Sequence, residues 1–205
     1  MRIEVDKVAS VTRSLKLNKR LTIQPEVAAE FGAVVVGRVL NDKSTYNTIE
    51  DVHGRMSTVQ AGDLIVGALG HRNALHGYEG VLPESVKAGD TLNLLNLGGV
   101  IGISVSHNPD VGAPFELEIL GQVLVYPDFA SRVGKPANIR MNALAPVAGA
   151  PKVPVVYVAG TCMNSGKTAA ACMLVKALSR AGYRVGACKL TGVSLIRDIL
   201  AMRDY

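Results

Sequence analysis

The chain has 205 residues, of which 48% are hydrophobic and 19% charged, so it is long enough for one large or two small globular domains. Its formal net charge is +5 at pH 7, but the basic residues are spread along the sequence and form no long run. Tryptophan is absent and aromatic residues make up only 4%, so stacking surfaces for single-stranded nucleic acid are not expected. The composition therefore predicts a small anionic substrate, and not a nucleic acid, as the partner.

Sequence features bearing on location predict a cytoplasmic protein. The N-terminus runs directly into a strand-like pattern and shows no apolar signal segment. No apolar stretch approaches the length of a membrane span. The three cysteines, Cys162, Cys172 and Cys188, are odd in number and are expected to be reduced thiols.

Residues 1–130 are predicted to form a mainly antiparallel β domain, barrel-like in form. Short apolar runs alternate with turn residues, which is typical of such folds. The expected strands are Arg2–Val5, Leu21–Ile23, Ala33–Leu40, Leu64–Leu69, Thr91–Leu97, Val100–Val105 and Phe115–Val125. A helix is predicted at Pro25–Phe31, which starts with proline and is followed by Gly32, and a second short one at Pro83–Lys87.

Two segments of this region, Ala61–Gly67 and Ala88–Leu94, look alike. Each opens with Ala-Gly-Asp, in which glycine supplies a positive φ and aspartate bonds back into the turn. One interpretation is a duplicated strand–turn unit that closes a small barrel. The other is two independent copies of a common turn.

The polar loop Gly70–Gly80 contains His71, Arg72 and His76. Such a set suits an anion or carboxylate site. Because loops are polar for general reasons, a solvated hairpin loop or a contact within a homo-oligomer is the favoured interpretation. The histidine spacing, with no cysteine or paired carboxylate nearby, matches no zinc pattern.

Residues 131–153 are rich in alanine, proline and glycine and predict a linker. Residues 154–205 then predict the opening of a parallel-sheet domain, whose first strand, Val153–Ala159, is apolar and β-branched, as in a strand covered on both faces. After a polar loop, apolar residues at helical spacing predict one buried stripe: Ala170, Met173, Leu174, Ala177, Leu178 and Ala181. Arg184–Lys189 predicts a second strand, and residues 193 to about 202 a last helix.

The loop between the first strand and the helix has the form of a phosphate-binding loop (P-loop). It reads Gly160-Thr161-Cys162-Met163-Asn164-Ser165-Gly166-Lys167-Thr168. The first glycine lies one residue further back than in G-x-x-x-x-G-K-[ST], a longer loop that several metabolic ATPases use. Backbone N–H groups at a helix start suit a polyphosphate. Lys167 would reach the β- and γ-phosphates and the Thr168 hydroxyl would coordinate Mg²⁺, while topology places Lys189 and Thr191 at the same edge.

Residues 154–195, about a fifth of the chain, resemble the cofactor-biosynthesis branch of the P-loop ATPases. The loop is similar to the G-T-x-x-x-x-G-K-[ST] loop of dethiobiotin synthetase and of cobyrinic acid and cobyric acid synthases. Gly186–Gly192 resembles the K-P-x-x-x-G segment of those enzymes, and equally the strand-plus-Lys-His segment of molybdopterin-guanine dinucleotide biosynthesis protein B. In dethiobiotin synthetases that lysine contacts phosphate and substrate, which the resemblance implies for Lys189. Cys162 departs from the pattern, because the dethiobiotin enzymes have an acidic residue there and the signature-lysine ATPases a lysine.

Together, these features predict an enzyme that uses ATP or GTP with Mg²⁺ to activate a carboxylate by phosphoryl transfer, in the synthesis of a cofactor or small metabolite. Lys167 and Lys189 are the predicted catalytic residues, and Thr168 the predicted metal ligand. The predicted nucleotide-binding residues are Gly160, Thr161, Asn164, Ser165, Gly166, Lys167 and Thr168. One alternative is a nucleotide-responsive regulatory protein whose β domain binds a metabolite or partner. Another is an isolated β domain with a vestigial appendage.

Only two strands of the predicted parallel sheet lie before Tyr205, and no later strand ends in the aspartate that would hold Mg²⁺ through water. The sheet is therefore expected to be truncated here or completed by a partner chain. In the truncated case, the 205 residues alone are expected to be inactive.

Overall fold

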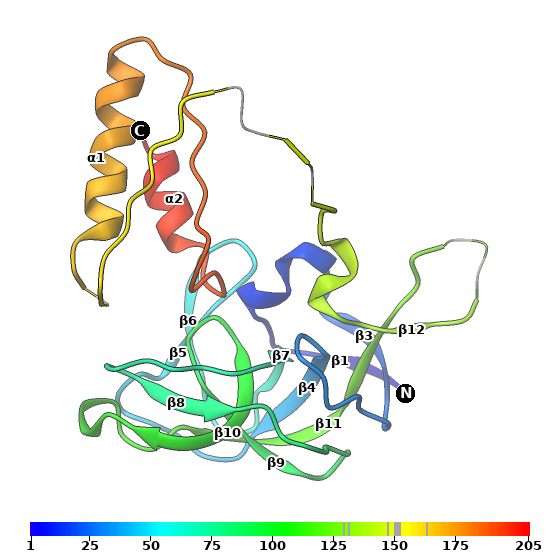
Figure 1. Cartoon of the computed structure of the whole chain (residues 1–205). Coiled ribbons are helices and arrows are strands. Elements are labelled where there is room, and N and C mark those ends of the chain that lie inside the picture. The colour runs from blue at the N-terminus through cyan, green and yellow to red at the C-terminus, as the bar shows by residue number, and fades with distance from the viewer. Residues whose placement is uncertain (129, 131, 147, 150–152, 163) are drawn as a thin grey trace.

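The computed structural model describes all residues except 129, 131, 147, 150–152 and 163 (Figure 1). Ser131 and Lys152 of the predicted linker, and Met163 of the predicted P-loop, therefore lie outside the described residues.

Most of the regular structure is β, and it lies before residue 137. The strands are β1 (Arg2–Glu4), β2 (Lys7–Val8), β3 (Arg20–Gln24), β4 (Val34–Val39), β5 (Thr48–Glu50), β6 (Met56–Thr58), β7 (Leu64–Leu69), β8 (Tyr78–Val81), β9 (Thr91–Leu94), β10 (Val100–His107), β11 (Phe115–Val125) and β12 (Lys135–Pro136). The helices are α1 (Lys167–Arg180) and α2 (Arg197–Arg203), with 3-10 turns η1 (Ser10–Leu15), η2 (Pro109–Val111) and η3 (Ile139–Asn142).

Most strands belong to one mixed sheet, ordered β1-β3-β11-β4-β7-β10-β8. Strands β2 and β10 run parallel to β7, whereas β4 runs antiparallel to it. Because β9 pairs with both β10 and β11, the pairings of β11, β4, β7, β10 and β9 form a closed ring among the described strands. Strands β5 and β6 form a separate hairpin.

The predicted strands of the β region are confirmed, two of them, β7 and β11, with the predicted bounds. Their alternation places apolar side chains in two buried clusters. One cluster contains Leu117, Ile119, Ile65 and Ile101, and the other contains Val34, Val36, Val66 and Val123. The short strands β2, β5, β6, β8 and β12 were not predicted, because two to four residues carry too little alternation to be recognised.

Both helices predicted in the β region are wrong. Residues 25–31 and 83–87 have no helical turn and instead meet in an antiparallel bridge between Glu26 and Lys87. In this arrangement Val27 and Val86 reach the core, and the Ala28 N–H donates to the buried Gln122 carboxamide oxygen at 2.9 Å. Tertiary packing therefore overrides the local proline and glycine signals.

The two Ala-Gly-Asp turns have equivalent hydrogen bonds. In each, glycine has a positive φ, its N–H donates to a neighbouring strand, and the aspartate side chain accepts the N–H three residues earlier. In the first turn, the N–H of Gly62 (φ +90°) donates to the Val39 carbonyl, and the Asp63 carboxylate accepts the Gln60 N–H. In the second turn, the N–H of Gly89 (φ +93°) donates to the Ile119 carbonyl, and the Asp90 carboxylate accepts the Lys87 N–H. Val39 and Ile119 lie on the paired strands β4 and β11, so the two turns pack against neighbouring strands in the same way.

Part of the Ala- and Pro-rich stretch packs on the β region. Strand β12 pairs with β11, and Ala137 is fully buried. The Asn142 side chain donates to the Ser14 carbonyl at 2.7 Å, which joins η3 to η1.

The two strands predicted after residue 152 do not form. Residues 153–159 and 184–189 have no ladder partner among the described residues, and a strand without a neighbour has unsatisfied backbone groups. Helix α1 is confirmed, but its predicted apolar stripe is not buried, and Met173 and Leu174 are exposed. No sheet among the described residues covers the predicted stripe. Within the described residues, neither α1 nor α2 is long and apolar enough to cross a membrane.

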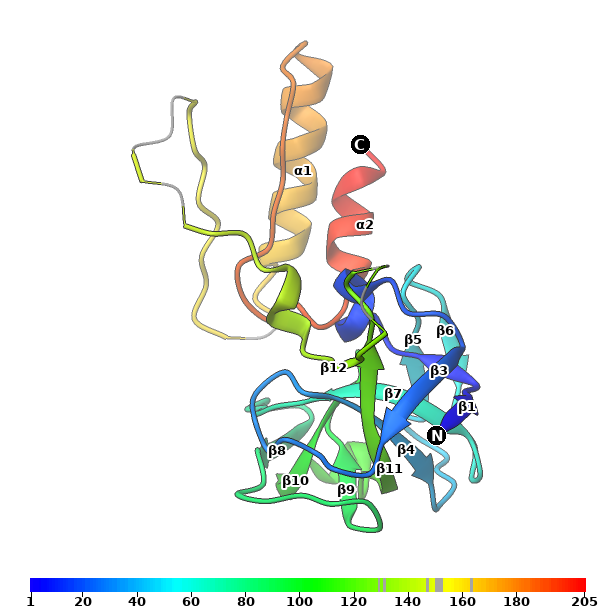
Figure 2. The same ribbon diagram turned by 90° about the vertical axis from the view of Figure 1, so that its right-hand side faces the viewer.

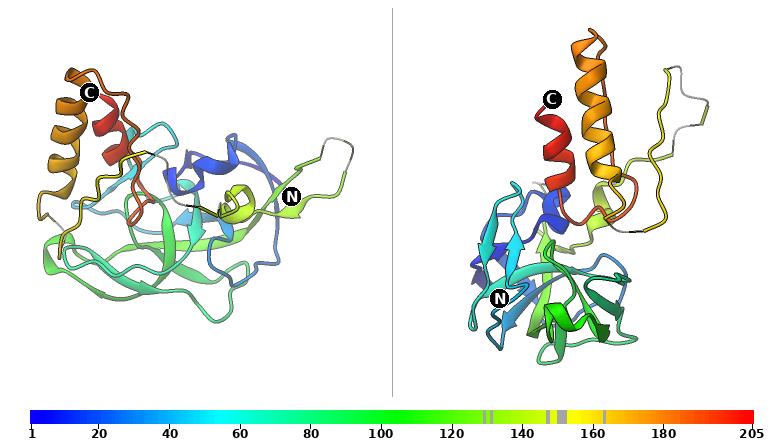
Figure 3. Two further views of the ribbon diagram at one scale, coloured as in Figure 1. Left: turned by 45° about the horizontal axis from the view of Figure 1, so that its top comes forward. Right: turned by 90° about the vertical axis from the view of Figure 1, so that its left-hand side faces the viewer.

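Helix α2 docks on the β region (Figures 2 and 3). The fully buried carboxylate of Glu50 accepts the N–H groups of Ile196, at 2.8 Å, and Arg197, at 3.1 Å. The helix begins at Arg197, four residues later than predicted, because the preceding turn is held by the β region. Ser194 anchors that turn, accepting from Ser10 Oγ at 2.7 Å and from Asn96 Nδ2 at 2.8 Å.

Candidate functional site

The candidate site is the loop that leads into α1. Helix α1 begins at Lys167, and its first hydrogen bond within the helix runs from the Ala170 N–H to the Gly166 carbonyl at 2.9 Å. Gly166 precedes the helix with φ +81°, and Asn164 has φ +60°. These two left-handed residues turn the chain sharply into the helix. Helix geometry leaves the first N–H groups of α1 without acceptors inside the helix, so they face the loop.

Gly160, at the start of the loop, lies against Ser165 and Lys167 at its other end. A Cβ atom at this position would be 2.6 Å from Ser165 Oγ and 3.0 Å from side-chain carbons of Lys167. Only glycine allows this approach without displacing those side chains. The structure thus brings together three predicted site residues, Gly160, Ser165 and Lys167.

The Lys167 ammonium folds back over the loop. It donates to the Cys162 carbonyl and, at 3.0 Å, to Ser165 Oγ. Lys167 and the adjacent Thr168 are half-buried, whereas Thr161, Asn164 and Ser165 are exposed. The loop is therefore open to solvent and not packed into an interior.

These features fit the polyphosphate and Mg²⁺ predicted from the sequence. The loop has a cationic side chain at its centre, a glycine contact that a Cβ would fill, and the start of a 14-residue helix. Thr168 is the second residue of α1, at the position where the sequence predicts the metal ligand. The described residues contain no cluster of histidine, cysteine, aspartate or glutamate that could hold a metal. A metal here would thus depend on Thr168 together with phosphate oxygens.

Lys189, the second predicted catalytic residue, lies in an ion pair with Asp198 of α2. The segment containing Lys189 runs back along α1 toward the end of the helix where the loop lies (Figures 1 and 2). Thr191, also predicted near the phosphates, is exposed. Sequence reasoning missed Asp198 and Glu50. The signal that could have identified Asp198 is its position as an acidic residue in the first turn of the last helix. No local sequence pattern indicates a role for Glu50.

Arg72, in the polar loop between residues 70 and 80, has a structural role. Its guanidinium donates to the Leu95 carbonyl and, at 3.1 Å, to the Tyr46 hydroxyl. It also lies 5.8 and 6.0 Å from the ring centroids of Tyr46 and Tyr78. His71 accepts the Leu82 N–H at 3.2 Å. These contacts support the interpretation of this segment as a structural loop and not as an anion site.

Burial shifts the pKa of two residues beside Arg72, Tyr78 and Lys43. Burial, with a smaller contribution from Tyr46, raises the pKa of Tyr78 to about 12, while Arg72 acts in the opposite direction. Lys43 lies 5.9 Å from the Tyr78 ring, and desolvation lowers the pKa of its ammonium. The lysine donates to the Val111 carbonyl at 3.0 Å, so it fastens a loop to the β region.

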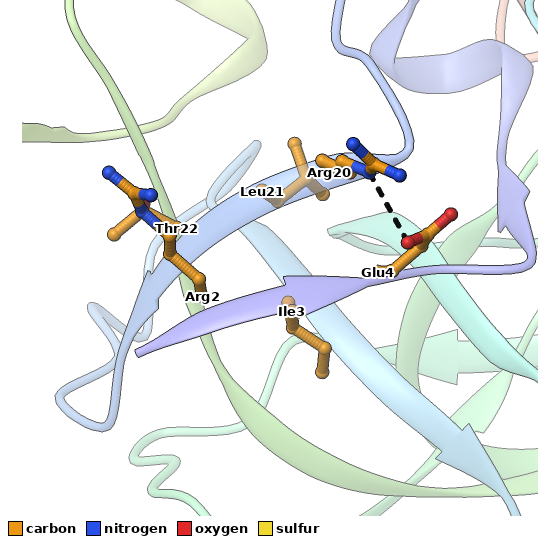
Figure 4. A pocket seen from close by; sticks show the side chains of 6 residues that line it. All are labelled: Arg2, Ile3, Glu4, Arg20, Leu21 and Thr22. Carbon is orange, nitrogen blue, oxygen red and sulfur yellow. Dashed lines mark hydrogen bonds and ion pairs between the residues drawn. The ribbon is translucent and has the colours of Figure 1, made fainter.

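A surface hollow of about 420 Å³ lies beside strands β1 and β3 (Figure 4). Its lining residues are Arg2, Ile3, Glu4, Arg20, Leu21 and Thr22. The polar groups seen there include an exposed ion pair, with Arg20 Nε 3.3 Å from Glu4 Oε2. A second hollow, of about 230 Å³, adjoins residues 73–79 and 106–108. Neither is lined by residues of the loop before α1, and exposed ion pairs of this kind contribute little binding energy.

Comparison with known proteins identifies no family for this chain: no family model, no curated protein and no solved structure matches it.

Proposed function

We propose that the chain is part of an ATP- and Mg²⁺-dependent P-loop enzyme that activates a carboxylate by phosphoryl transfer in the synthesis of a cofactor or small metabolite. The observation that carries this proposal is the loop closed around Lys167, with Gly160 against Ser165 and a left-handed Gly166 opening α1. GTP is the other nucleotide compatible with the loop. The carboxylate and the cofactor-synthesis setting rest on the sequence resemblance of residues 154–195.

Each loop residue has a distinct task in this proposal. Lys167 exchanges its contacts with Cys162 and Ser165 for phosphate oxygens, and the N–H groups at the start of α1 neutralise further negative charge. Thr168 contributes its hydroxyl to Mg²⁺. Bound ATP would supply the phosphoryl group for transfer. Lys189 adds a second positive charge in this proposal, as the resemblance of Gly186–Gly192 implies.

The direct test is isothermal titration of the full 205-residue chain with Mg²⁺–ATP. Lys167→Ala should weaken binding by about 100-fold or more, because a charge-assisted contact to phosphate is lost. Lys176→Ala is the matched control, since Lys176 lies on the same helix and contacts the Tyr205 ring, 5.0 Å away. Equal ATP affinity in the parent and in Lys167→Ala would contradict the proposed role of the loop.

A nucleotide-responsive regulatory protein is the second candidate. It is favoured by one observation, the docking of α2 on the β region through the buried Glu50. In this function the β region binds a metabolite or partner and the P-loop acts as the switch. Phosphate release that depends on a small carboxylate would support the enzyme. ATP binding that changes only the affinity for a partner would support the switch.

We also propose a fold, a location and an oligomeric state for the chain. The β region is proposed to be barrel-like, in accord with its closed ring of strand pairings. Residues 153–159 and 184–189 are proposed to form strands of a parallel sheet. A cytoplasmic location is supported by the free thiols of Cys162, Cys172 and Cys188. We further propose that the substrate is a small anion and that the chain forms a homo-oligomer.

A further inference from the structure

Strand β1 forms one edge of the large sheet. It pairs with β3, and no described strand pairs with its other side. The Val5 N–H, directly after β1, donates to the Lys19 carbonyl at 2.8 Å, so the backbone groups of Val5 point toward β3. Because bonded and non-bonded residue pairs alternate along an antiparallel ladder, the N–H and C=O groups of Arg2 and Glu4 point away from β3. They are therefore available to a further strand.

The side chains of this edge carry opposite charges two residues apart. Arg2 and Glu4 project to one side of β1, and Ile3 projects to the other (Figure 4). Both charged side chains are exposed, and Arg20 contacts only one carboxylate oxygen of Glu4, Oε2. The hollow of about 420 Å³ adjoins the same residues. The edge thus has open backbone groups, two opposite charges and space for the side chains of a neighbouring strand.

We infer that this edge binds a second copy of the chain, by antiparallel pairing of the two β1 strands about a two-fold axis at Ile3. In that register Arg2 of each copy lies opposite Glu4 of the other, so both cross-strand pairs join opposite charges. The same register also places the outward backbone groups of Arg2 opposite those of Glu4. Charge and hydrogen bonding therefore select one alignment, whereas a parallel alignment in register would place like charges side by side.

This inference rests on the homo-oligomer proposed above and names its surface, and it does not require nucleotide binding. A symmetric pair suits the edge better than an unrelated strand, because Arg2 and Glu4 complement each other in charge and in backbone position. Since β1 has only three residues, the contact area is small, and we expect a dimer that dissociates on dilution.

The test is sedimentation equilibrium of the full 205-residue chain, without an N-terminal tag, over a series of concentrations. The parent should show a monomer–dimer equilibrium. Arg2→Glu should raise the dissociation constant of the dimer by about tenfold or more, because like charges then meet at both symmetry-related pairs. Arg184→Glu is the matched control, since it makes the same charge reversal at an exposed position after α1. The control should dimerise as the parent does.

A mixture of two variants tests the alignment itself. Glu4→Arg alone should weaken the dimer as Arg2→Glu does, because its copies also meet with like charges. Mixed in equal amounts, the two variants should form a heterodimer about as readily as the parent forms its dimer, since opposite charges meet again at both pairs. Mixing would not restore association if the substitutions acted only by disturbing the fold.

Hydrogen exchange followed by NMR uses the unmodified chain. The Glu4 amide should exchange more slowly as the protein concentration rises, because its N–H gains an acceptor in the dimer. The Val5 amide, already bonded to the Lys19 carbonyl, should not change.

The outcomes separate this inference from the proposals above. If the parent is monomeric at every concentration, both the β1 interface and the homo-oligomer are wrong, the edge is left to a strand of a different protein, and the nucleotide function is unaffected. If the parent associates but Arg2→Glu matches Arg184→Glu, or the mixed variants do not associate, the homo-oligomer stands and the β1 interface is wrong.

Discussion

The β region and the segment after residue 153 differ in how they are held in place. In the β region, two clusters of apolar side chains are shielded from water, with Leu117 and Ile119 at 0% exposure. Among the described residues after 153, Met202 alone is buried, and Tyr157 is 72% exposed. The second segment is instead anchored by polar contacts of Ser194, Ile196 and Arg197 to the first.

This difference shows that the two regions depend on different forces. Burial of apolar surface stabilises the β region through its own residues. The loop before α1 and α1 itself have no core of their own among the described residues, so their position depends on the docked α2 and its few hydrogen bonds. Substitutions in the two regions should therefore have unequal effects.

The largest effect is expected for a leucine substitution in the β region, and the same substitution on α1 is its comparison. Leu117→Ala should lower the free energy of unfolding by about 3–5 kcal/mol, because the fully buried side chain leaves a cavity. Leu174→Ala on α1 should cost less than about 1 kcal/mol, since that side chain is 39% exposed. Urea denaturation followed by circular dichroism measures both. Equal losses would contradict the claim that only the β region has its own core.

A glycine pair in the β region is expected to show the next largest effect. Gly99→Ala should destabilise the chain by about 2–4 kcal/mol, because φ is +94° and the new Cβ would lie 2.1 Å from the Cβ of Ala9. Gly62→Ala has a similar φ, +90°, but meets nothing within 4 Å, so it should cost only about 1 kcal/mol. The difference in melting temperature between the two variants separates the cost of the steric clash from the cost of the strained backbone.

Docking of α2 should be weakened by Glu50→Ala. The loss of the carboxylate leaves the Ile196 and Arg197 amides without their acceptor and should reduce the local stability of α2 by about 1–3 kcal/mol. Hydrogen exchange over residues 196–203 should become faster, with strands β4 and β11 unchanged. Glu84→Ala, at an exposed position, is the control. Unchanged exchange in α2 would show that apolar contacts alone hold this helix.

The last expected effect, confined to alkaline solution, is a pH dependence in the β region. Because the pKa of Tyr78 is about 12 in the folded chain and about 10 when unfolded, the unfolded state loses this proton first. The stability from Tyr78 is therefore complete below pH 10 and is lost as the pH rises from 10 toward 12. Tyr78→Phe should show a weaker fall in melting temperature over that range, whereas Tyr126→Phe, at an exposed position, should follow the parent.

The loop before α1 shows how much of a candidate site can be predicted from local sequence. Glycines at 160 and 166 with Lys167 predicted a tight turn into a helix, and that turn is present. The loop is local, so neighbouring residues determine its backbone. The partner of Lys189 was not predictable in this way. Lys189 lies in the segment between α1 and α2, and Asp198 of α2 reaches it only because the chain turns back between the two residues.

The sequence by itself determined the main strands of the β region, the two Ala-Gly-Asp turns and the start of α1, because alternation, glycine and proline act over a few residues. The tertiary structure decided the rest. It turned the segments around Glu26 and Lys87 into a bridge and placed Glu50 beneath α2, while residues 153–159 have no strand partner among the described residues. The bridge and the docking of α2 depend on contacts between residues 60 to almost 150 positions apart, and no local pattern records such contacts.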